Sequence, residues 1–231
     1  MKKIVLVVAT VAAALLSSTA EAALVAYWNF NGLSIATASA PGSGGVPLSI
    51  AADEGAGTID LSPWAGLVDD FAGATLNALN ADPAGASLSL VAGGPTGGPD
   101  PGNQSYISTT VSTTGLKDPI ISFATRGTST GFNASGWSYS TNGVDFTPIP
   151  NSSTATRETT FALATVDLTG VAAVADQSSV TFRYAVDGAS SNSGNNRIDN
   201  LQINATAIPE PGTLALAGLG LLGVVASRRR R

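Results

Sequence analysis

Residues 180–186 read Val180-Thr181-Phe182-Arg183-Tyr184-Ala185-Val186, and apolar and polar side chains alternate along the whole stretch. Successive side chains of a β-strand point to opposite faces of a sheet, so the alternation predicts a strand that is buried on one side only. The even-numbered side chains are expected to face a hydrophobic core. The odd-numbered ones, with Arg183 at their centre, are expected to face outward.

Further short runs of β-branched and aromatic residues, separated by Gly, Pro, Asn and Ser, predict more strands and no helix of convincing period. The predicted strands are 24–30, 46–50, 58–61, 75–79, 86–91, 105–112, 119–125, 136–141, 144–147, 160–168 and 197–205. Asn142-Gly143 lies between two of them and predicts a two-residue hairpin, because a type I′ turn needs positive φ at both positions. Loops are expected at 42–45, 93–102 and 188–196.

The last predicted strand has a register problem. Leu201 and Ile203 share one face, but Ile198 falls on the opposite face and Asp199 on theirs. A β-bulge near Asp199-Asn200 would return Ile198 to the core side. Alternatively, Asp199 points inward and is paired with an arginine or a cation.

The N-terminal residues have the features of a secretion signal. Met1-Lys2-Lys3 precedes an apolar run at 4–16, and Ala20-Glu21-Ala22 provides small residues at a cleavage site. We therefore expect export through the Sec translocon and removal of residues 1–22 by signal peptidase after Ala22. The absence of cysteine excludes disulfides and a lipoprotein anchor.

The C-terminal residues combine Pro209-Glu210-Pro211, an apolar run at 213–226 and four arginines, Arg228 to Arg231. About 14 helical residues span roughly 21 Å, which suffices for a thin bilayer if the arginines snorkel. The arginines should stay cytoplasmic and hold residues 23–207 outside. The prolines separate this transmembrane helix from the preceding domain. The plain alternative is an ordinary membrane anchor.

This tripartite tail resembles the PEP-CTERM sorting signal of Gram-negative bacteria. The resemblance implies that an exosortase recognises Pro209, Glu210 and Pro211 and processes the tail, with Arg228, Arg229, Arg230 and Arg231 retaining it in the inner membrane until then. Residues 107–205 also resemble the jelly-roll-like β-sandwich ectodomain common among PEP-CTERM proteins, which implies a fold but no activity. The expected organisation is a signal peptide (1–22), one all-β sandwich (23–207) and the sorting signal (208–231).

Charge and composition limit the chemistry of residues 23–207. They contain five basic and fourteen acidic residues, a net charge of −9, which argues against a nucleic-acid partner. The chain has no histidine and no cysteine, so catalytic triads and ordinary zinc sites are excluded. The carboxylate pairs Asp69-Asp70, or Asp187 with Asp199, have no diagnostic context for glycoside hydrolysis. We expect no enzyme activity and no cofactor.

Two weak binding signals remain. Aromatic side chains on a β-sandwich can stack on sugars, and Trp137 and Tyr139 are the candidates for glycan contact, with core packing as the alternative role. Trp28 and Trp64 are the other aromatic residues that could stack on a sugar. Oxygen atoms for calcium are offered by Asp187, Asn195, Asn196 and Asp199, with turn and cap hydrogen bonding as the alternative.

Together these observations predict an exported protein that passes through the inner membrane to the cell surface or extracellular matrix. Its expected role is structural or interactive and linked to exopolysaccharide or the envelope. A carbohydrate-binding module is the second hypothesis, and a polysaccharide-active enzyme is a distant third.

Overall fold

A computed structural model describes residues 22–33, 49–64, 67–92 and 104–208. Its strands are β1 (Ala22–Trp28), β2 (Ser49–Ala51), β3 (Glu54–Gly55), β4 (Gly57–Asp60), β5 (Val68–Ala72), β6 (Ala86–Val91), β7 (Tyr106–Val111), β8 (Leu116–Gly127), β9 (Ala134–Ser140), β10 (Thr147–Pro148), β11 (Ala162–Asp167), β12 (Val180–Asp187) and β13 (Asn195–Ala207). Two short 3-10 helices, η1 (Ser62–Trp64) and η2 (Ala172–Val174), lie between strands.

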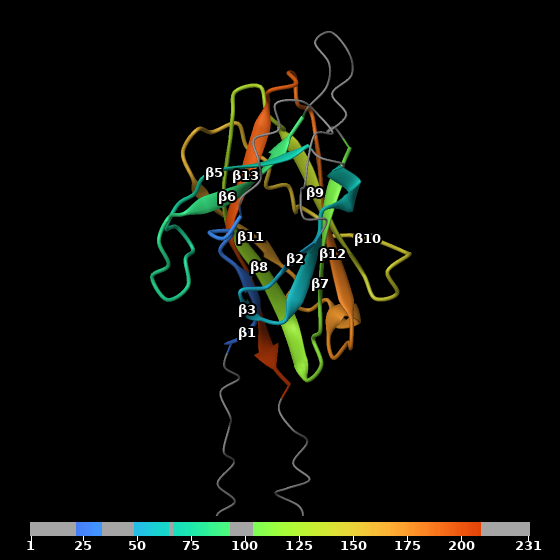
Figure 1. The fold of residues 1–231 in the computed structure, drawn as a ribbon. Helices are drawn as coiled ribbons and strands as arrows, with labels where there is room; N and C mark the ends of the chain where they lie inside the picture. Colours follow the sequence, from blue (N-terminus) through green and yellow to red (C-terminus); the bar gives the residue numbers. More distant parts are fainter. Residues whose placement is uncertain (1–21, 34–48, 65–66, 93–103, 209–231) are drawn as a thin grey trace, which may run out of the picture. The chain divides into compact units, whose positions relative to one another are not determined.

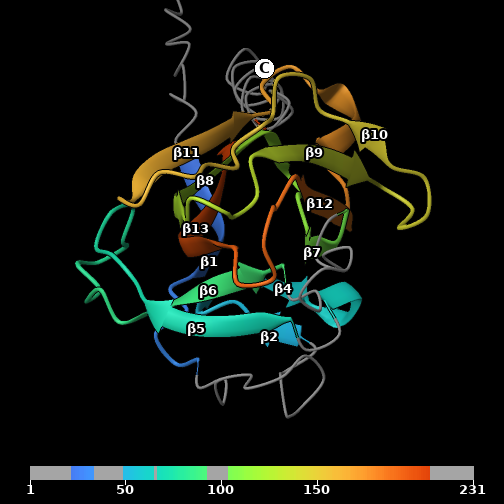
Figure 2. The ribbon, with the colours of Figure 1, turned by 90° about the horizontal axis from the view of Figure 1, so that it is seen from above.

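The strands form two antiparallel sheets that face each other in a β-sandwich (Figures 1 and 2). One sheet has the order β11-β8-β13-β1-β3 and is extended by β6, which pairs with β13, and by β5, which pairs with β6. The other has the order β10-β9-β12-β7-β4-β2. The all-β sandwich predicted from the alternation of apolar residues is confirmed.

Strand β12 lies inside the six-stranded sheet and contributes four core side chains. Val180, Phe182, Tyr184 and Val186 are each at most 1% exposed, whereas the side chains between them are half-buried on the outer face. Tyr184 packs against Trp137 of β9 with ring centroids 4.9 Å apart. The predicted two-faced strand is therefore present, and its apolar face contacts the facing sheet through the core.

Strand β13 contains the predicted bulge. Its register against β8 shifts between Asp199 and Gln202, and Asn200 has a positive φ of 50°. This extra length places Ile198 in the core together with Leu201 and Ile203. Asp199 is thereby directed to the opposite face, so the bulge resolves the register problem and the alternative of an inward, arginine-paired Asp199 is wrong.

Several other predicted strands are confirmed with shifted ends, but two are wrong. Residues 75–79 form part of the loop 73–85 between β5 and β6, where Asn77 has a φ of 62° that an extended strand does not allow. Residues 144–147 are not a strand either, because β10 comprises only Thr147–Pro148. Conversely, β5 was missed: its sequence, VDDFA, places two acids inside the strand.

The hairpin between β9 and β10 exists, but its turn is longer than predicted. Strand β9 ends at Ser140 and β10 begins at Thr147, so residues 141–146 connect the strands. Only Gly143 has positive φ, and the Asn142 side chain organises the turn by accepting bonds from the N–H groups of Val144 and Asp145, each 2.9 Å long. The side-chain bonds of Asn142 replace the type I′ geometry.

The loop 73–85 packs on the outer face of the seven-stranded sheet. Asn200 Nδ2 donates to the carbonyls of Ala74 (2.8 Å) and Leu76 (3.0 Å), and Gln202 Nε2 donates to that of Asn77 (2.6 Å). Side chains of β13 thus donate hydrogen bonds to backbone carbonyls of a loop that is not part of either sheet.

Strands β1 and β13 bring the two ends of the described domain together. Ala22 pairs with Thr206, and both strands leave the sandwich at the same end (Figure 1). The predicted loops 42–45 and 93–102, residues 1–21 and the sorting tail from Pro209 lie outside the described residues. Within the ranges that the structure describes, neither helix is long and apolar enough to cross a membrane.

Candidate functional site

The outer face of the six-stranded sheet carries mostly small and hydroxylated side chains. Arg183 of β12 is flanked by Ser138 on β9 and Ser108 on β7, its direct cross-strand partners. Two residues further along the same face, Ala185 is flanked by Gly136 and Tyr106. Arg183 and Tyr106 are the large side chains of this group, and the side chains beside them, including Gly136 and Ala185, are small.

Arg183 contacts two aromatic rings. Its guanidinium carbon is 4.0 Å from the ring centroid of Tyr106 and 3.5 Å from that of Phe146, which reaches over the sheet from the β9–β10 turn. All three side chains are half-buried. We call these three residues the arginine stack. The two cation–π contacts hold the guanidinium in place.

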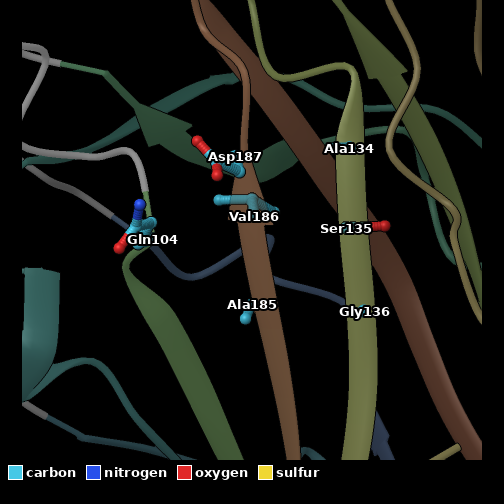
Figure 3. A pocket seen from close by; sticks show the side chains of 7 residues that line it. All are labelled: Gln104, Ala134, Ser135, Gly136, Ala185, Val186 and Asp187. Carbon is cyan, nitrogen blue, oxygen red and sulfur yellow. The ribbon is translucent and has the colours of Figure 1, made fainter.

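An open hollow of about 250 Å³ lies over β9 and β12 (Figure 3), and its lining residue Ala185 is two positions from Arg183 along β12. It is lined by Gln104, Ala134, Ser135, Gly136, Ala185, Val186 and Asp187. Gly136 and Ala185 form its floor, and a Cβ added at Gly136 would meet no atom within 4 Å. The hollow exists because the strands present their smallest residues here.

Polar groups border this hollow on the side away from β9. Gln104 precedes β7 and Asp187 ends β12, and both are exposed (Figure 3). Asp187 Oδ1 accepts a 2.7 Å bond from the Gly188 N–H. The Ser135 hydroxyl instead points away and accepts bonds from the N–H groups of Thr154 and Ala155. The hollow thus combines a small, weakly polar floor with one carboxylate and one amide at its rim.

The aromatic residues predicted for glycan contact are not on this face. Trp137 is 2% exposed and packs against Phe123 and Tyr184, which matches the alternative role in core packing. Tyr139 is half-buried and packs against the core. Trp28 and Trp64 are fully buried. Trp137 and Tyr139 belong to the odd-numbered, inward positions of β9, and their alternative role as core residues holds.

The residues considered for calcium are not brought together. Asp187 is exposed on one sheet, whereas Asp199 is fully buried on the outer face of the other, beneath the loop 73–85. Asn196 joins two segments, accepting from Phe132 N–H and donating to Thr156 O, both at 2.8 Å. Nowhere in the described ranges do three or more Asp, Glu, His or Cys side chains form a group that could hold a metal.

Asp199 has an unusual environment. Its two oxygens accept bonds from the N–H groups of Ala74 (2.6 Å) and Asn200 (2.9 Å). Burial opposes the charged form and raises the pKa of Asp199 from 3.8 to about 7, although both backbone bonds act in the opposite direction. The carboxyl group is therefore a structural link between β13 and the loop 73–85.

The arginine stack was not found by sequence reasoning. The alternation placed Arg183 outward, but nothing in the sequence indicates that Tyr106, 77 positions away, and Phe146 would cover it. The hollow was missed for the same reason, because cross-strand pairing of Gly136 with Ala185 is set by the tertiary register.

The comparison with family models concerns the C-terminal residues. The model described as the PEP-CTERM protein-sorting motif matches residues 207–231. The chain carries a PEP-CTERM sorting motif. The motif implies export and an exosortase-sorted surface protein, and it includes Pro209, Glu210 and Pro211. None of the curated proteins matches the chain.

Solved structures similar to the domain are distant. CtCBM11 shares 14% identity, with coverage of 84% of this chain and 100% of that one and a TM-score of 0.38. A carbohydrate-binding module from Cellvibrio mixtus lichenase 5A in complex with cellotriose shares 14% identity over 60% of this chain and 86% of that one, with a TM-score of 0.30. The K3 cleaved adhesin domain of Lys-gingipain from Porphyromonas gingivalis W83 shares 12% identity over 60% and 89%, with a TM-score of 0.36.

Proposed function

We propose that this exosortase-sorted surface protein is an interaction protein whose ectodomain binds polysaccharide, such as the exopolysaccharide of the envelope or matrix. The observation that supports this most directly is the hollow floored by Gly136 and Ala185 beside the arginine stack. A sugar ring offers apolar C–H faces and hydroxyl edges. Small residues and aromatic rings suit the faces, and the Asp187 carboxylate and the Gln104 amide suit the hydroxyls.

The proposed role is binding without catalysis. Retaining and inverting glycosidases place two carboxyl groups across the bond they cleave. The residues that line the hollow include a single carboxylate, Asp187. The site is shallow and open, so it can accommodate a long polymer but does not exclude water, as many enzyme active sites do. The runner-up role, a purely structural protein of the envelope, would leave the hollow without a ligand.

Gly136→Leu tests this proposal. The substitution fills the hollow from its floor without a clash, because no atom lies within 4 Å of the added Cβ and the backbone has no positive φ. Gly32→Leu is the matched control: Gly32 is equally open and exposed but lies outside the hollow. We expect the mature protein to bind polysaccharides on a glycan array, the Gly32 variant to bind equally, and the Gly136 variant to lose at least tenfold in affinity.

Two results would contradict the proposal. The mature protein would bind no polysaccharide on a broad array, or Gly136→Leu would bind as well as wild type. Turnover of any bound polysaccharide would replace the proposed binding role with an enzymatic one.

A further inference from the structure

The arginine stack is the most unusual group of charges among the described residues. The domain has only five basic residues against fourteen acidic ones. Even so, the Arg183 side chain forms no ion pair and no hydrogen bond with the part of the chain that the structure describes, and its Nε is buried without a partner. The buried Nε is out of reach of a ligand, but the terminal N–H groups of the same guanidinium are not among the buried atoms, so a ligand can accept hydrogen bonds from them without displacing an internal partner.

The surroundings of Arg183 limit the chemical class of an acceptor that could bind to it. Tyr106 and Phe146 both lie within 4.0 Å of the guanidinium carbon, so a ligand has to approach the terminal N–H groups, which form a fork, rather than the surfaces that the two rings cover. A planar carboxylate matches such a fork with two parallel hydrogen bonds. Ser108 and Ser138 are the cross-strand neighbours of Arg183, and they place small side chains rather than competing charges beside it.

The position of the arginine stack links this carboxylate to the hollow. Arg183 and Ala185 project from the same face of β12, two residues apart, which is about 6–7 Å along a strand. Tyr106 connects the two groups, because it contacts Arg183 and is the cross-strand partner of Ala185, which lines the hollow. A sugar unit in the hollow would therefore bring its own substituents, or those of the next unit, to Arg183.

We propose that the arginine stack recognises the carboxylate of a uronic acid, so that the polysaccharide bound at this face is acidic. This inference rests on the proposed function and specifies its ligand class. The net charge of −9 repels polyanions in general, so adsorption through long-range attraction does not contribute, and recognition depends on the short-range contact with Arg183.

The test compares two forms of one polymer that differ only in charge: polygalacturonate and its fully methyl-esterified form. With the mature protein, we expect at least tenfold tighter binding of the acid form, since hydrogen bonds to charged groups are the stronger class. In Arg183→Gln this preference should disappear while binding of the ester persists. Arg183→Lys keeps the charge but loses the planar fork, so it should restore only part of the preference.

Arg126→Gln is the matched control. Arg126 is also half-buried and on an outer face, but it lies on β8 of the other sheet. Its replacement by Gln changes the net charge by the same amount as Arg183→Gln and leaves the arginine stack intact. We expect it to keep the wild-type preference, and thermal melting should confirm that each variant is folded.

The outcomes separate the two proposals. Equal binding of both polymers by the wild type, or an unchanged preference in Arg183→Gln, overturns the carboxylate inference and leaves the proposed function standing. Binding of neither form, together with no binding of other polysaccharides, overturns both.

Discussion

At the residue scale, Asp199 makes the stability of the domain dependent on pH. Its pKa is raised to about 7 by burial, whereas the ordinary value is 3.8. Between these two values the folded state holds a proton that the unfolded state has released. Stability therefore falls as pH rises from about 4 to about 7 and is constant above that range.

We expect the free energy of unfolding to fall by about 2 kcal/mol between pH 5.5 and 8, from 1.36 kcal/mol per pKa unit. The chain contains no histidine or cysteine, the residues whose ordinary pKa values lie in or near this window. Denaturant unfolding at a series of pH values measures the slope. Asp199→Asn should have a flat profile, whatever its absolute stability, and a flat profile in the wild type would refute the raised pKa.

A second prediction at this scale concerns Trp137. Its indole packs against Phe123 and Tyr184 and donates a 3.3 Å bond to Thr154 Oγ1. Trp137→Ala should lower the free energy of unfolding by about 3–5 kcal/mol, as deletion of a buried aromatic ring does. Val144→Ala, at a position 78% exposed, should change it by less than about 0.5 kcal/mol. A stable Trp137 variant with impaired glycan binding would instead indicate that Trp137 contacts the glycan.

At the scale of elements, the hydroxyl group of Tyr27 helps to hold the loop 73–85 on the sheet. Tyr27 OH donates to Asn200 Oδ1 (2.8 Å) and accepts from the Leu79 N–H (3.2 Å). Tyr27→Phe leaves both groups without this partner and should cost about 1–2 kcal/mol.

Hydrogen exchange is the direct measurement, and amides of residues 73–85 should exchange faster in Tyr27→Phe. Tyr139→Phe is the control, because the Tyr139 hydroxyl makes no hydrogen bond to any described residue. If exchange in the loop is unchanged, Asp199, Asn200 and Gln202 suffice to hold it, and the contribution of Tyr27 is small.

The same scale shows what the sequence can reveal. Period-two alternation located β12 and β6, and the conflict between Ile198 and Asp199 located the bulge in β13, because both are consequences of strand geometry within one segment. The strand predicted at 75–79 failed because its apolar residues belong to a loop that β13 side chains hold. The proposed binding face could not be predicted from the sequence, because Arg183, Tyr106 and Phe146 come together only in the tertiary structure.

At the scale of the whole molecule, the sorting motif makes a prediction about processing. Glu210→Ala leaves the apolar run 213–226 and the four terminal arginines intact, so membrane insertion should persist. If an exosortase reads Pro209-Glu210-Pro211, the variant should accumulate in the inner membrane as a heavier species. Fractionation and intact mass in a host with the cognate enzyme measure both effects.

Replacing Arg228 to Arg231 by Ser is the contrasting variant, and it should loosen orientation and retention instead. The intact mass of the wild type also reports the first cleavage, with Ala23 expected as the new N-terminus. Identical mass and location of wild type and Glu210→Ala would reduce the tail to an ordinary membrane anchor.

The pairing of β1 with β13 has a consequence for the timing of folding. Strand β13 pairs with β1, β6 and β8, so the last of the described strands to be synthesised occupies the middle of its sheet. Without it, β1 and β8 present unpaired edges and the seven-stranded sheet is divided. Contacts this distant along the chain form slowly. A polypeptide threaded N-terminus first across a membrane would therefore remain unfolded until residue 207 has emerged, and only then collapse as one cooperative unit on the far side.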